Sequence, residues 1–307
     1  MNPRDEFMHE YPKSTDTPWK ENWYFNFIDR KHRAWGIHHI SLMRHTQMGR
    51  FTAVHVVDDE IMPYTNLVGV QDLKELSDGT LAVEFIEPFK RFRVTFNGPR
   101  HQTEITYEAL FEAFYYGKPD DTRADRALSV HHYRQALVAR GTLTKDGNRR
   151  TIECVCDRDH TWGYRDEGML TGWNWVGVYF PDRTINLHRI LMGERAFAAG
   201  YVSSVRGNAP ITRMEVEATR FIDDAPVSAI YTGYDREGRA LARVRSQMFS
   251  TLRMPMPVTD AKKVMMLHEN FAEFADLTTG ETGNGIDEYL INPDEPYHER
   301  PGISGED

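Results

Sequence analysis

Apolar residues recur at every second position along much of the chain, and this period constrains the fold more than any other feature of the sequence. In ENWYFNFID, Trp23, Phe25 and Phe27 alternate with Asn22, Tyr24 and Asn26. The segments RFRVTF, GWNWVGVYF, ITRMEVEATRF and ALARVRSQMFSTL repeat the pattern. Successive side chains of a β-strand point to opposite faces, so a period of two predicts strands with one buried face. The sequence therefore predicts an all-β protein.

Turn signals separate the alternating segments, as in Asp78-Gly79, Asp146-Gly147 and the stretch from Asp235 to Gly238. Short turns between strands predict antiparallel meanders. The segment TEITYEALFEAFYYG fits both a helix and a long strand, and its β-branched and aromatic residues favour the strand. Many short antiparallel strands close into a barrel or pack as a sandwich, and the inward-facing residues of a small barrel are then the place to look for function.

The length of 307 residues suits one large domain or two of ordinary size. The polar stretch GKPDDTRADRA has the composition of a linker and divides the chain into parts of similar size. We therefore predict an N-terminal β-domain over 1–125 and a C-terminal β-domain over 126–292. The segment 293–307 is rich in proline and charge, and we predict a flexible tail there.

Composition excludes several classes of function. The net charge of -9 argues against nucleic-acid binding, which needs a basic face. No apolar run approaches the roughly 20 residues of a membrane span, and the polar N-terminus does not resemble a signal peptide, so we predict a cytoplasmic protein. The two cysteines, Cys154 and Cys156, are expected to be free thiols. We predict no metal and no cofactor.

The segment CDRDHTWGYRD, residues 156–166, concentrates ionisable and aromatic side chains. In a strand, His160, Trp162, Tyr164 and Asp166 share one face, which then carries an acid, a base and two aromatic rings. A carboxyl group in apolar surroundings has a raised pKa and can donate a proton, while histidine titrates near neutrality and can accept one. We therefore interpret this face as part of a ligand cavity, with His160, Tyr164 and Asp166 as candidate catalytic residues.

The same segment has a structural interpretation, which stays open at this stage. Arg158 and Arg165 could form an ion-pair network with Asp157, Asp159 and Asp166 that stabilises a domain junction.

Three further stretches offer candidate binding residues. Trp173, Trp175 and Tyr179 share one face of a strand and form either a pocket wall or an aromatic core. Trp23 shares a face with Glu21 in the first strand. His38 and His39 are adjacent and must point to opposite sides, and we assign His39 to the ligand side. Adjacent histidines on a flat strand do not readily bind one metal ion.

Several of these stretches resemble the AttH and carotenoid 1,2-hydratase (CrtC-like) family of tandem lipocalin-like proteins. ENWYFNF is similar to that family's opening strand, with Asn22 where a tryptophan often stands. GTLTKDGNRRTIECVCDRDHTWGYRD resembles the start of its second domain, which carries an Asp-His-x-Trp-Gly-x-Arg-Asp signature. GETGNGIDEYLI is similar to the final strand of uncharacterised bacterial relatives. The resemblance implies two tandem lipocalin-like antiparallel β-barrels with a hydrophobic small molecule in or between them.

The resemblance also implies a type of chemistry. The family includes hydratases of isoprenoid double bonds and fungal pericyclases that work without a redox cofactor. His160 and Trp162 match the His-x-Trp pair of carotenoid hydratases, whereas Tyr179 and Asp182 stand closer to that pair than the Tyr and Asp of the family. We therefore expect a cofactor-independent lyase acting on a hydrophobic terpenoid, steroid-like or aromatic compound, with Asp166 or Asp182 as the acid and His160 as the base. A carrier without catalysis, an isomerase or a pericyclase remain the alternatives, and a homodimer is left open.

Overall fold

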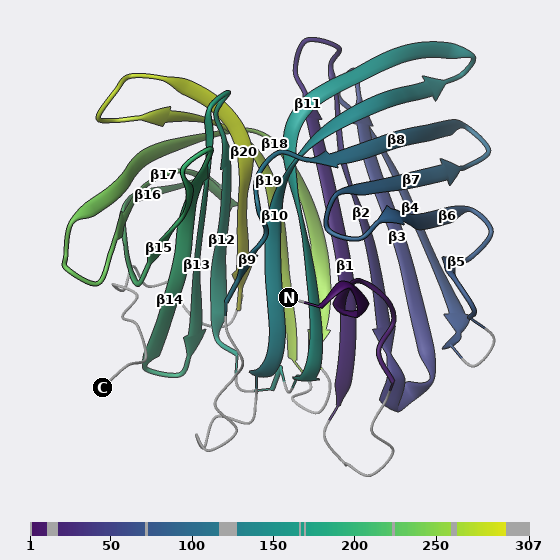
Figure 1. Cartoon of the computed structure of the whole chain (residues 1–307), viewed down its shortest axis with the longest axis horizontal. Coiled ribbons are helices and arrows are strands. Elements are labelled where there is room, and N and C mark those ends of the chain that lie inside the picture. Colours follow the sequence, from purple (N-terminus) through teal and green to yellow (C-terminus); the bar gives the residue numbers. More distant parts are fainter. Residues whose placement is uncertain are drawn as a thin grey trace. The chain divides into compact units, whose positions relative to one another are not determined.

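The computed structural model describes residues 2–10, 18–70, 73–116, 128–165, 167–168, 170–222, 225–258 and 263–292. The chain forms two compact units, Met1–Asp166 and Glu167–Asp307, and each contains one antiparallel sheet (Figure 1). The prediction of an all-β chain with two tandem barrel-like domains is confirmed. The predicted tail over 293–307 lies outside the described residues.

The first unit is built on an 11-stranded sheet with the order β4-β3-β2-β1-β11-β10-β8-β7-β6-β5, and β9 pairs with β10. Two short 3-10 helices also belong to this unit: η1 (Pro3–Glu6) and η2 (Arg44–Thr46). The strands are β1 (Trp19–Asp29), β2 (Ala34–Met43), β3 (Met48–Val57), β4 (Glu60–Gly69), β5 (Leu76–Ser77), β6 (Leu81–Glu87), β7 (Arg91–Asn97), β8 (His101–Ala109), β9 (Phe114–Tyr115), β10 (Leu128–Lys145) and β11 (Asn148–Arg165).

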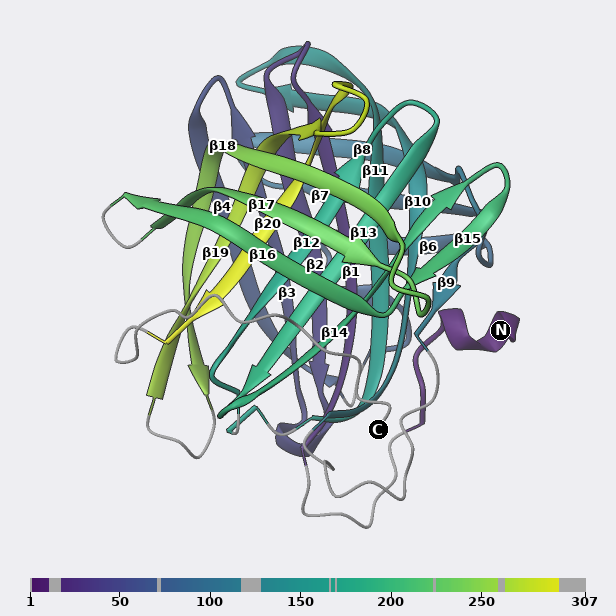
Figure 2. The same ribbon diagram turned by 90° about the vertical axis from the view of Figure 1, so that its left-hand side faces the viewer.

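The second unit is built on a nine-stranded sheet with the order β15-β14-β13-β12-β20-β19-β18-β17-β16, which curls into a nearly closed barrel (Figure 2). Its strands are β12 (Gly172–Tyr179), β13 (Arg183–Met192), β14 (Arg195–Ser204), β15 (Gly207–Ile211), β16 (Arg213–Ile222), β17 (Ala225–Tyr234), β18 (Ala240–Val258), β19 (Lys263–Asp276) and β20 (Thr282–Ile291). The final strand β20 lies between β12 and β19, in the middle of this sheet.

The alternation in the sequence accounts for both cores. Trp23, Phe25 and Phe27 of β1 point to the inside of the first unit and are fully buried there. In the second unit, Val176 and Val178 of β12 take the same inward positions. The segment TEITYEALFEAFYYG was predicted as a strand rather than a helix, and its residues 103–109 do belong to strand β8. None of the helices in the described part of the chain has the length and apolar character needed to cross a membrane.

The boundary between the units differs from the predicted boundary at residue 125. Strands β10 and β11 form one hairpin with the register Lys145↔Asn148, and β11 then pairs with β1 through Trp23↔His160. Because backbone hydrogen bonds join this hairpin to β1 and β8, it completes the first sheet and does not begin the second. The CDRDHTWGYRD segment therefore lies in the first unit up to Arg165.

Candidate active site in the first unit

Strand β11 brings its even-numbered side chains beside the odd-numbered side chains of β1. The register pairs Trp23 with His160 and Glu21 with Trp162. Directly opposed residues of an antiparallel pair point to the same side, so two segments that lie far apart in the sequence form one patch. The patch faces the inside of the first unit, where His160, Glu21 and Trp23 are fully buried.

His160 lies at the centre of this patch. Its Nε2 atom is 3.1 Å from Oε1 of Glu21, and its Nδ1 atom is 3.2 Å from the hydroxyl of Tyr133 on β10. Its ring stacks on Trp23 with the ring centres 4.5 Å apart. Both nitrogens therefore have partners, and the ring is fixed in orientation.

The hydroxyl of Tyr133 also contacts Glu6, which comes from η1 near the N-terminus. Tyr133 donates to Oε2 of Glu6 at 2.6 Å. Arg158 donates to both carboxylate oxygens of Glu6, at 2.8 Å and 2.5 Å, and both side chains are fully buried. A buried charge is costly without a partner, and this two-point contact balances one charge with another.

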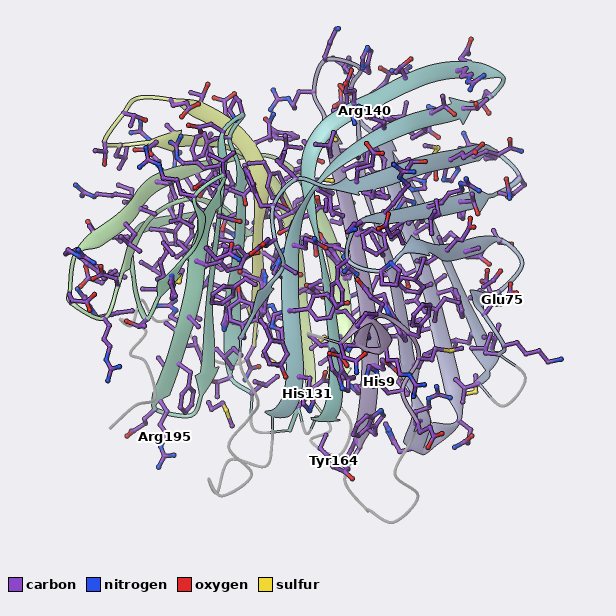
Figure 3. The ribbon with its side chains drawn as sticks, viewed as in Figure 1. His9, Glu75, His131, Arg140, Tyr164 and Arg195 are labelled. Carbon is purple, nitrogen blue, oxygen red and sulfur yellow. The ribbon has the colours of Figure 1, made fainter. Side chains whose placement is uncertain are left out.

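His9 forms the opposite end of the network. Its Nδ1 atom is 2.7 Å from Oε1 of Glu21, and its backbone N–H also donates to that carboxylate. The His9 ring stacks on Trp162 with centres 4.3 Å apart, and Trp162 stacks in turn on His131 at 4.9 Å. Figure 3 labels His9 beside the N-terminal helix, and His131 lies nearby. With 23% of its side chain exposed, His9 connects the buried groups to the surface.

We call Glu6, Tyr133, His160, Glu21 and His9 the buried polar chain. Burial alone would raise the pKa of Glu21, but the hydrogen bonds from His160 and His9 bring it below its ordinary value. Burial lowers the pKa of His160, and the contact with Glu21 opposes this only in part. Burial raises the pKa of Tyr133 well above its ordinary value. Near neutral pH these directions favour an ionised Glu21, a neutral His160 and a protonated Tyr133.

In this state three contacts link Glu6, Tyr133, His160 and Glu21, namely Tyr133–Glu6, Tyr133–His160 and His160–Glu21. The Tyr133 hydroxyl and a neutral His160 supply only two protons for them. If Tyr133 donates to Glu6, His160 must carry its proton on Nδ1, and its bare Nε2 then faces the carboxylate of Glu21. If Tyr133 donates to His160 instead, Nε2–H reaches Glu21, and the 2.6 Å contact between Tyr133 and Glu6 has no proton. One added proton satisfies every contact. The arrangement can therefore take up a proton, hold it and release it.

The donor set also deserves comparison with a metal site. One atom each of His9, Glu21 and His160 lies within 4.8 Å of the others, and two imidazoles with a carboxylate are ligands that transition metals accept. Ligands about 2.1 Å from a tetrahedral ion lie roughly 3.4 Å apart. The contacts of 2.7 Å and 3.1 Å to Oε1 of Glu21 are shorter and fit protons between the atoms.

The residues predicted from the sequence divide between the two units. Trp23, His160 and Trp162 come together in the buried patch, and Tyr164 packs at its edge against Trp19, with ring centres 5.2 Å apart. Asp166 lies outside the described residues.

The remaining predicted residues belong to the second unit. Trp173 donates to Glu288 at 2.6 Å, Trp175 stacks on His188, and Tyr179 is buried. All three point away from the core residues Val176 and Val178 on the same strand. The Asp182 side chain is 75% exposed and pairs with Arg183.

The structural interpretation of the β11 segment describes part of it. On the odd-numbered face, Asp157 accepts from Arg134 at 2.6 Å and from Asn26 at 2.7 Å, which is an ion-pair network. On the even-numbered face, Arg158 pairs with Glu6, whereas the structural interpretation paired it with an aspartate of its own strand.

The adjacent histidines of β2 do point to opposite sides. His38 faces the core, where its Nε2 is 2.9 Å from Nε2 of His55, while His39 is half-buried near Tyr24 on the other face. His39, which we had assigned to the ligand side, thus lies on the face of the sheet opposite to the His160 patch.

Sequence reasoning missed most partners of His160. Glu21 was recognisable only by sharing a face with Trp23. Glu6, His9 and Tyr133 lie in segments without an alternating pattern around an acid or base, and they approach His160 only because the sheet pairs β1 with β11 and η1 lies against it.

Comparison with solved structures supports the fold. An AttH-like protein from Nitrosomonas europaea superposes with a TM-score of 0.70 and 11% identity over 94% of this chain and 95% of that chain. A structure of CghA with Sch210972 gives 0.61 and 13% over 91% and 90%. Kievitone hydratase from Nectria haematococca gives 0.59 and 11%, covering 89% of each chain. The predicted likeness to AttH-type proteins is thereby confirmed for the fold.

No curated protein matches the chain in sequence. The family model described as "Domain of unknown function (DUF7064)" matches residues 2–293, which is most of the chain, and the protein therefore belongs to this family.

Proposed function

We propose that the protein is an enzyme that adds or removes water, or a comparable small fragment, on a hydrophobic small molecule by proton transfer through the buried polar chain. The observation that carries the proposal is the proton count: three contacts link Glu6, Tyr133, His160 and Glu21, and the Tyr133 hydroxyl and a neutral His160 supply two protons for them. A hydratase must deliver a proton to a carbon atom and later recover it. Solved structures with the same fold include a hydratase, kievitone hydratase, and CghA.

The position of His9 indicates where a substrate would bind. Its ring lies parallel to Trp162, with 9° between the planes, and its Nδ1 contacts Glu21. A flat unsaturated substrate that displaced this ring would stack on Trp162 and reach the carboxylate and imidazole of the chain. Positive charge that develops on the protonated substrate would then face the π-electrons of Trp162.

Each residue of the site then has a role. His160 and Glu21 hold the transferable proton next to the substrate, and Tyr133 passes the change of hydrogen bonding on to Glu6. Arg158 holds the carboxyl group of Glu6 in place with two hydrogen bonds. Trp23 and Trp162 hold the imidazole and the substrate between aromatic faces, which supplies the orientation that proton transfer to carbon requires.

The test begins with the small molecules that purified protein carries. The protein is denatured, the extracted compounds are identified by mass spectrometry, and each compound is incubated with fresh wild-type protein, with His160→Gln and with Glu21→Gln. We expect a mass change equal to water or another small fragment with the wild type, and a rate lower by about 10²- to 10⁴-fold with either variant, the range that a positioned acid or base contributes.

His32→Gln is the matched control, because His32 also pairs with a carboxylate, Asp29 at 2.8 Å, but lies 31% exposed at a turn. It should turn over like the wild type. A compound that binds the wild type and both active-site variants and is never converted would identify a carrier. Conversion that survives both substitutions would show pericyclic or isomerase chemistry set by pocket shape. A rate abolished by chelator and restored by a transition metal would reassign His9, Glu21 and His160 as ligands.

A further inference from the structure

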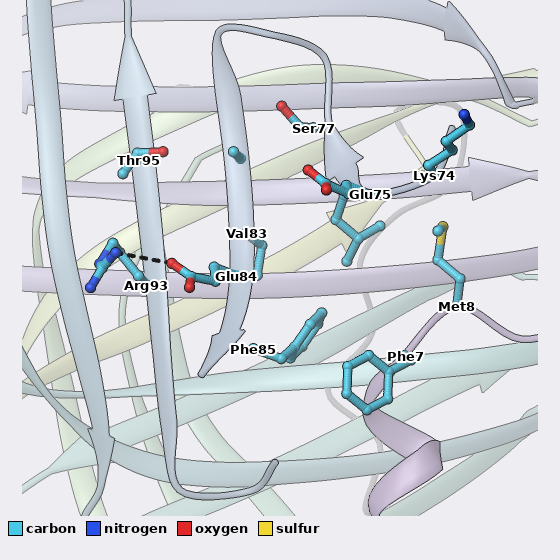
Figure 4. Close-up of a pocket in the computed structure, with 12 residues that line it drawn as sticks. Phe7, Met8, Lys74, Glu75, Ser77, Val83, Glu84, Phe85, Arg93 and Thr95 are labelled. Atoms are coloured by element: carbon cyan, nitrogen blue, oxygen red, sulfur yellow. Dashed lines mark hydrogen bonds and ion pairs between the residues drawn. The ribbon is translucent and has the colours of Figure 1, made fainter. Parts of the chain in front are cut away.

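A pocket of about 600 Å³ opens in the first unit beside the N-terminal segment, between that segment and strands β5, β6 and β7 (Figure 4). Cavities of roughly 300 to 1,000 Å³ are the size of ligand sites. Phe7 and Met8 form one wall, and Leu76, Val83 and Phe85 form the apolar part of the other.

The aromatic residues of the pocket are arranged to hold a ring. Figure 4 shows Phe7 and Phe85 next to each other, and their ring centres are 5.4 Å apart in an edge-to-face arrangement. Phe7 is 44% exposed although a large aromatic side chain gains by burial. A ligand in the pocket would cover this surface.

The charges of the pocket balance. Glu84 and Arg93 pair with each other at 3.0 Å, and Lys74 and Glu75 add one charge of each sign. The lining thus has no net charge with which to select an anion or a cation. The hydroxyls of Ser77 and Thr95 offer single hydrogen bonds to a polar group on an otherwise apolar molecule.

The wall of the pocket is adjacent in sequence to two members of the buried polar chain. Four consecutive residues are divided between the two: Glu6 bonds Arg158 and Tyr133, Phe7 and Met8 line the pocket, and His9 bonds Glu21. A molecule that displaces the backbone of Phe7 and Met8 would also displace Glu6 and His9, because only one or two peptide units separate these residues from Phe7.

We propose that this pocket binds a neutral, largely apolar molecule with an aromatic or ring system, and that its occupation shifts His9 and with it the hydrogen bonding of His160. The binding half of the proposal stands on the pocket itself, and only the significance of the coupling for catalysis rests on the proposed function.

The probe is 2-naphthol, which is neutral and carries two fused rings and one hydroxyl, and its anionic counterpart is 2-naphthoate. We expect saturable binding of 2-naphthol to the wild type by isothermal titration calorimetry, and weaker binding of 2-naphthoate. Phe7→Ala and Phe85→Ala should each weaken 2-naphthol about tenfold, because each removes an aromatic contact. Phe221→Ala is the control, since Phe221 is similarly exposed, at 37%, but lies on β16 of the other unit.

Coupling is read from the imidazole signals of His9 and His160 in proton–nitrogen correlation spectra. At one concentration of 2-naphthol below saturation, both signals should shift in the wild type and should shift clearly less in Phe85→Ala. His160→Gln should still bind 2-naphthol saturably, so loss of catalysis and loss of this site are separate results. Equal affinity in wild type, Phe7→Ala and Phe85→Ala would overturn the site, and binding without any shift of either histidine would overturn the coupling.

Discussion

Arg158 places a positive charge inside the first unit, and Glu6 balances it. Both side chains are fully buried, and the guanidinium group also lies 4.0 Å from the ring centre of Phe92. Burial alone would lower the pKa of Arg158, but the contacts with Tyr133 and Glu6 raise it above its ordinary value. The charge is thus permanent, and the fold depends on the carboxylate that η1 supplies.

Removal of one member of this pair should cost more than removal of both. Arg158→Met leaves the Glu6 carboxylate buried without its cation and should lower the free energy of unfolding by about 3–5 kcal/mol. The double variant Glu6→Gln with Arg158→Met should recover a large part of that loss. Urea unfolding of the three proteins measures the difference. A double variant that is no more stable than Arg158→Met would contradict the assignment of a charge pair.

The sequence made part of the site predictable. The period of two in ENWYFNFID and CDRDHTWGYRD correctly groups Trp23 with Glu21 and His160 with Trp162, since each grouping is local. Their meeting was not predictable, because strand pairing depends on backbone hydrogen bonds between segments 139 residues apart in the sequence. The carboxylate that contacts His160 belongs to Glu21, while Asp182 is 75% exposed in the second unit and Asp166 lies outside the described residues.

Among the elements, the hairpin of β10 and β11 determines the architecture of the first unit. Each strand has 18 residues, and the two-residue turn Asp146-Gly147 joins them. Both turn residues have positive φ angles, 48° and 81°, as the tight turn of a twisted hairpin requires. The turn predicted from Asp146-Gly147 is therefore confirmed.

The turn glycine should be sensitive to a side chain. Gly147→Ala places a Cβ atom at φ 81° with no neighbouring atom within 4 Å, so the cost comes from the backbone and not from a clash. We expect the free energy of unfolding to fall by about 1–2 kcal/mol. Gly69→Ala is the control, because Gly69 also has open space around it but lies in strand β4 with no positive φ. Equal losses in the two variants, measured by chemical denaturation, would exclude the turn conformation as the cause.

The boundary between the two units could not be predicted from local sequence patterns. Strands are recognisable because alternation is local, and the fold class followed from it. The polar stretch at 117–127 had a linker composition, but the hairpin that follows it pairs back onto β8 and β1. Composition describes a segment's affinity for water, whereas the unit to which a strand belongs is set by its hydrogen-bonded neighbours.

At the scale of the whole molecule, the interiors of the two units carry different titratable groups. In the first unit, burial lowers the pKa of His38 to about 3 and that of His55 well below its ordinary value, which keeps both rings neutral. In the second unit, burial raises the pKa of Asp287 to about 6, although Tyr231 donates a hydrogen bond to it. Burial likewise lowers the pKa of His268 to about 4.

These shifts predict that acid destabilises the first unit more than the second. Below pH 6.5 His38 binds a proton in the unfolded state but stays neutral in the folded state. The free energy of unfolding of the first unit therefore falls by about 3 kcal/mol by pH 4.5 through this residue. His55 acts in the same direction. In the second unit, His268 costs a similar amount over that window. Asp287 raises the free energy of unfolding of the second unit by about 2 kcal/mol over the same pH range. The reason is that Asp287 binds a proton below pH 6 in the folded state, whereas in the unfolded state it does so only near pH 4.

Urea titrations at pH 7 and pH 4.5, followed by amide NMR signals assigned to each unit, measure this difference. The midpoint of the first unit should fall more on acidification. In Asp287→Asn the second unit should lose the stabilisation that protonation of Asp287 supplies at pH 4.5. It should therefore be more sensitive to acid in the variant than in the wild type. Parallel shifts of both units in the wild-type protein would rule out the buried histidines as the source.

The pairing of β1 with β11 also means that β1 is synthesised well before the strand that covers one of its edges. Glu6 precedes Arg158 by 152 residues, which a ribosome adding roughly 5–20 residues per second takes about 8 to 30 seconds to deliver. During that interval β1 can pair with β2 on one side, while its other edge waits for a strand that has not been made. An open strand edge is a template for pairing with other chains. Translation of the segment up to residue 165 is therefore the period in which this protein most depends on protection from its neighbours.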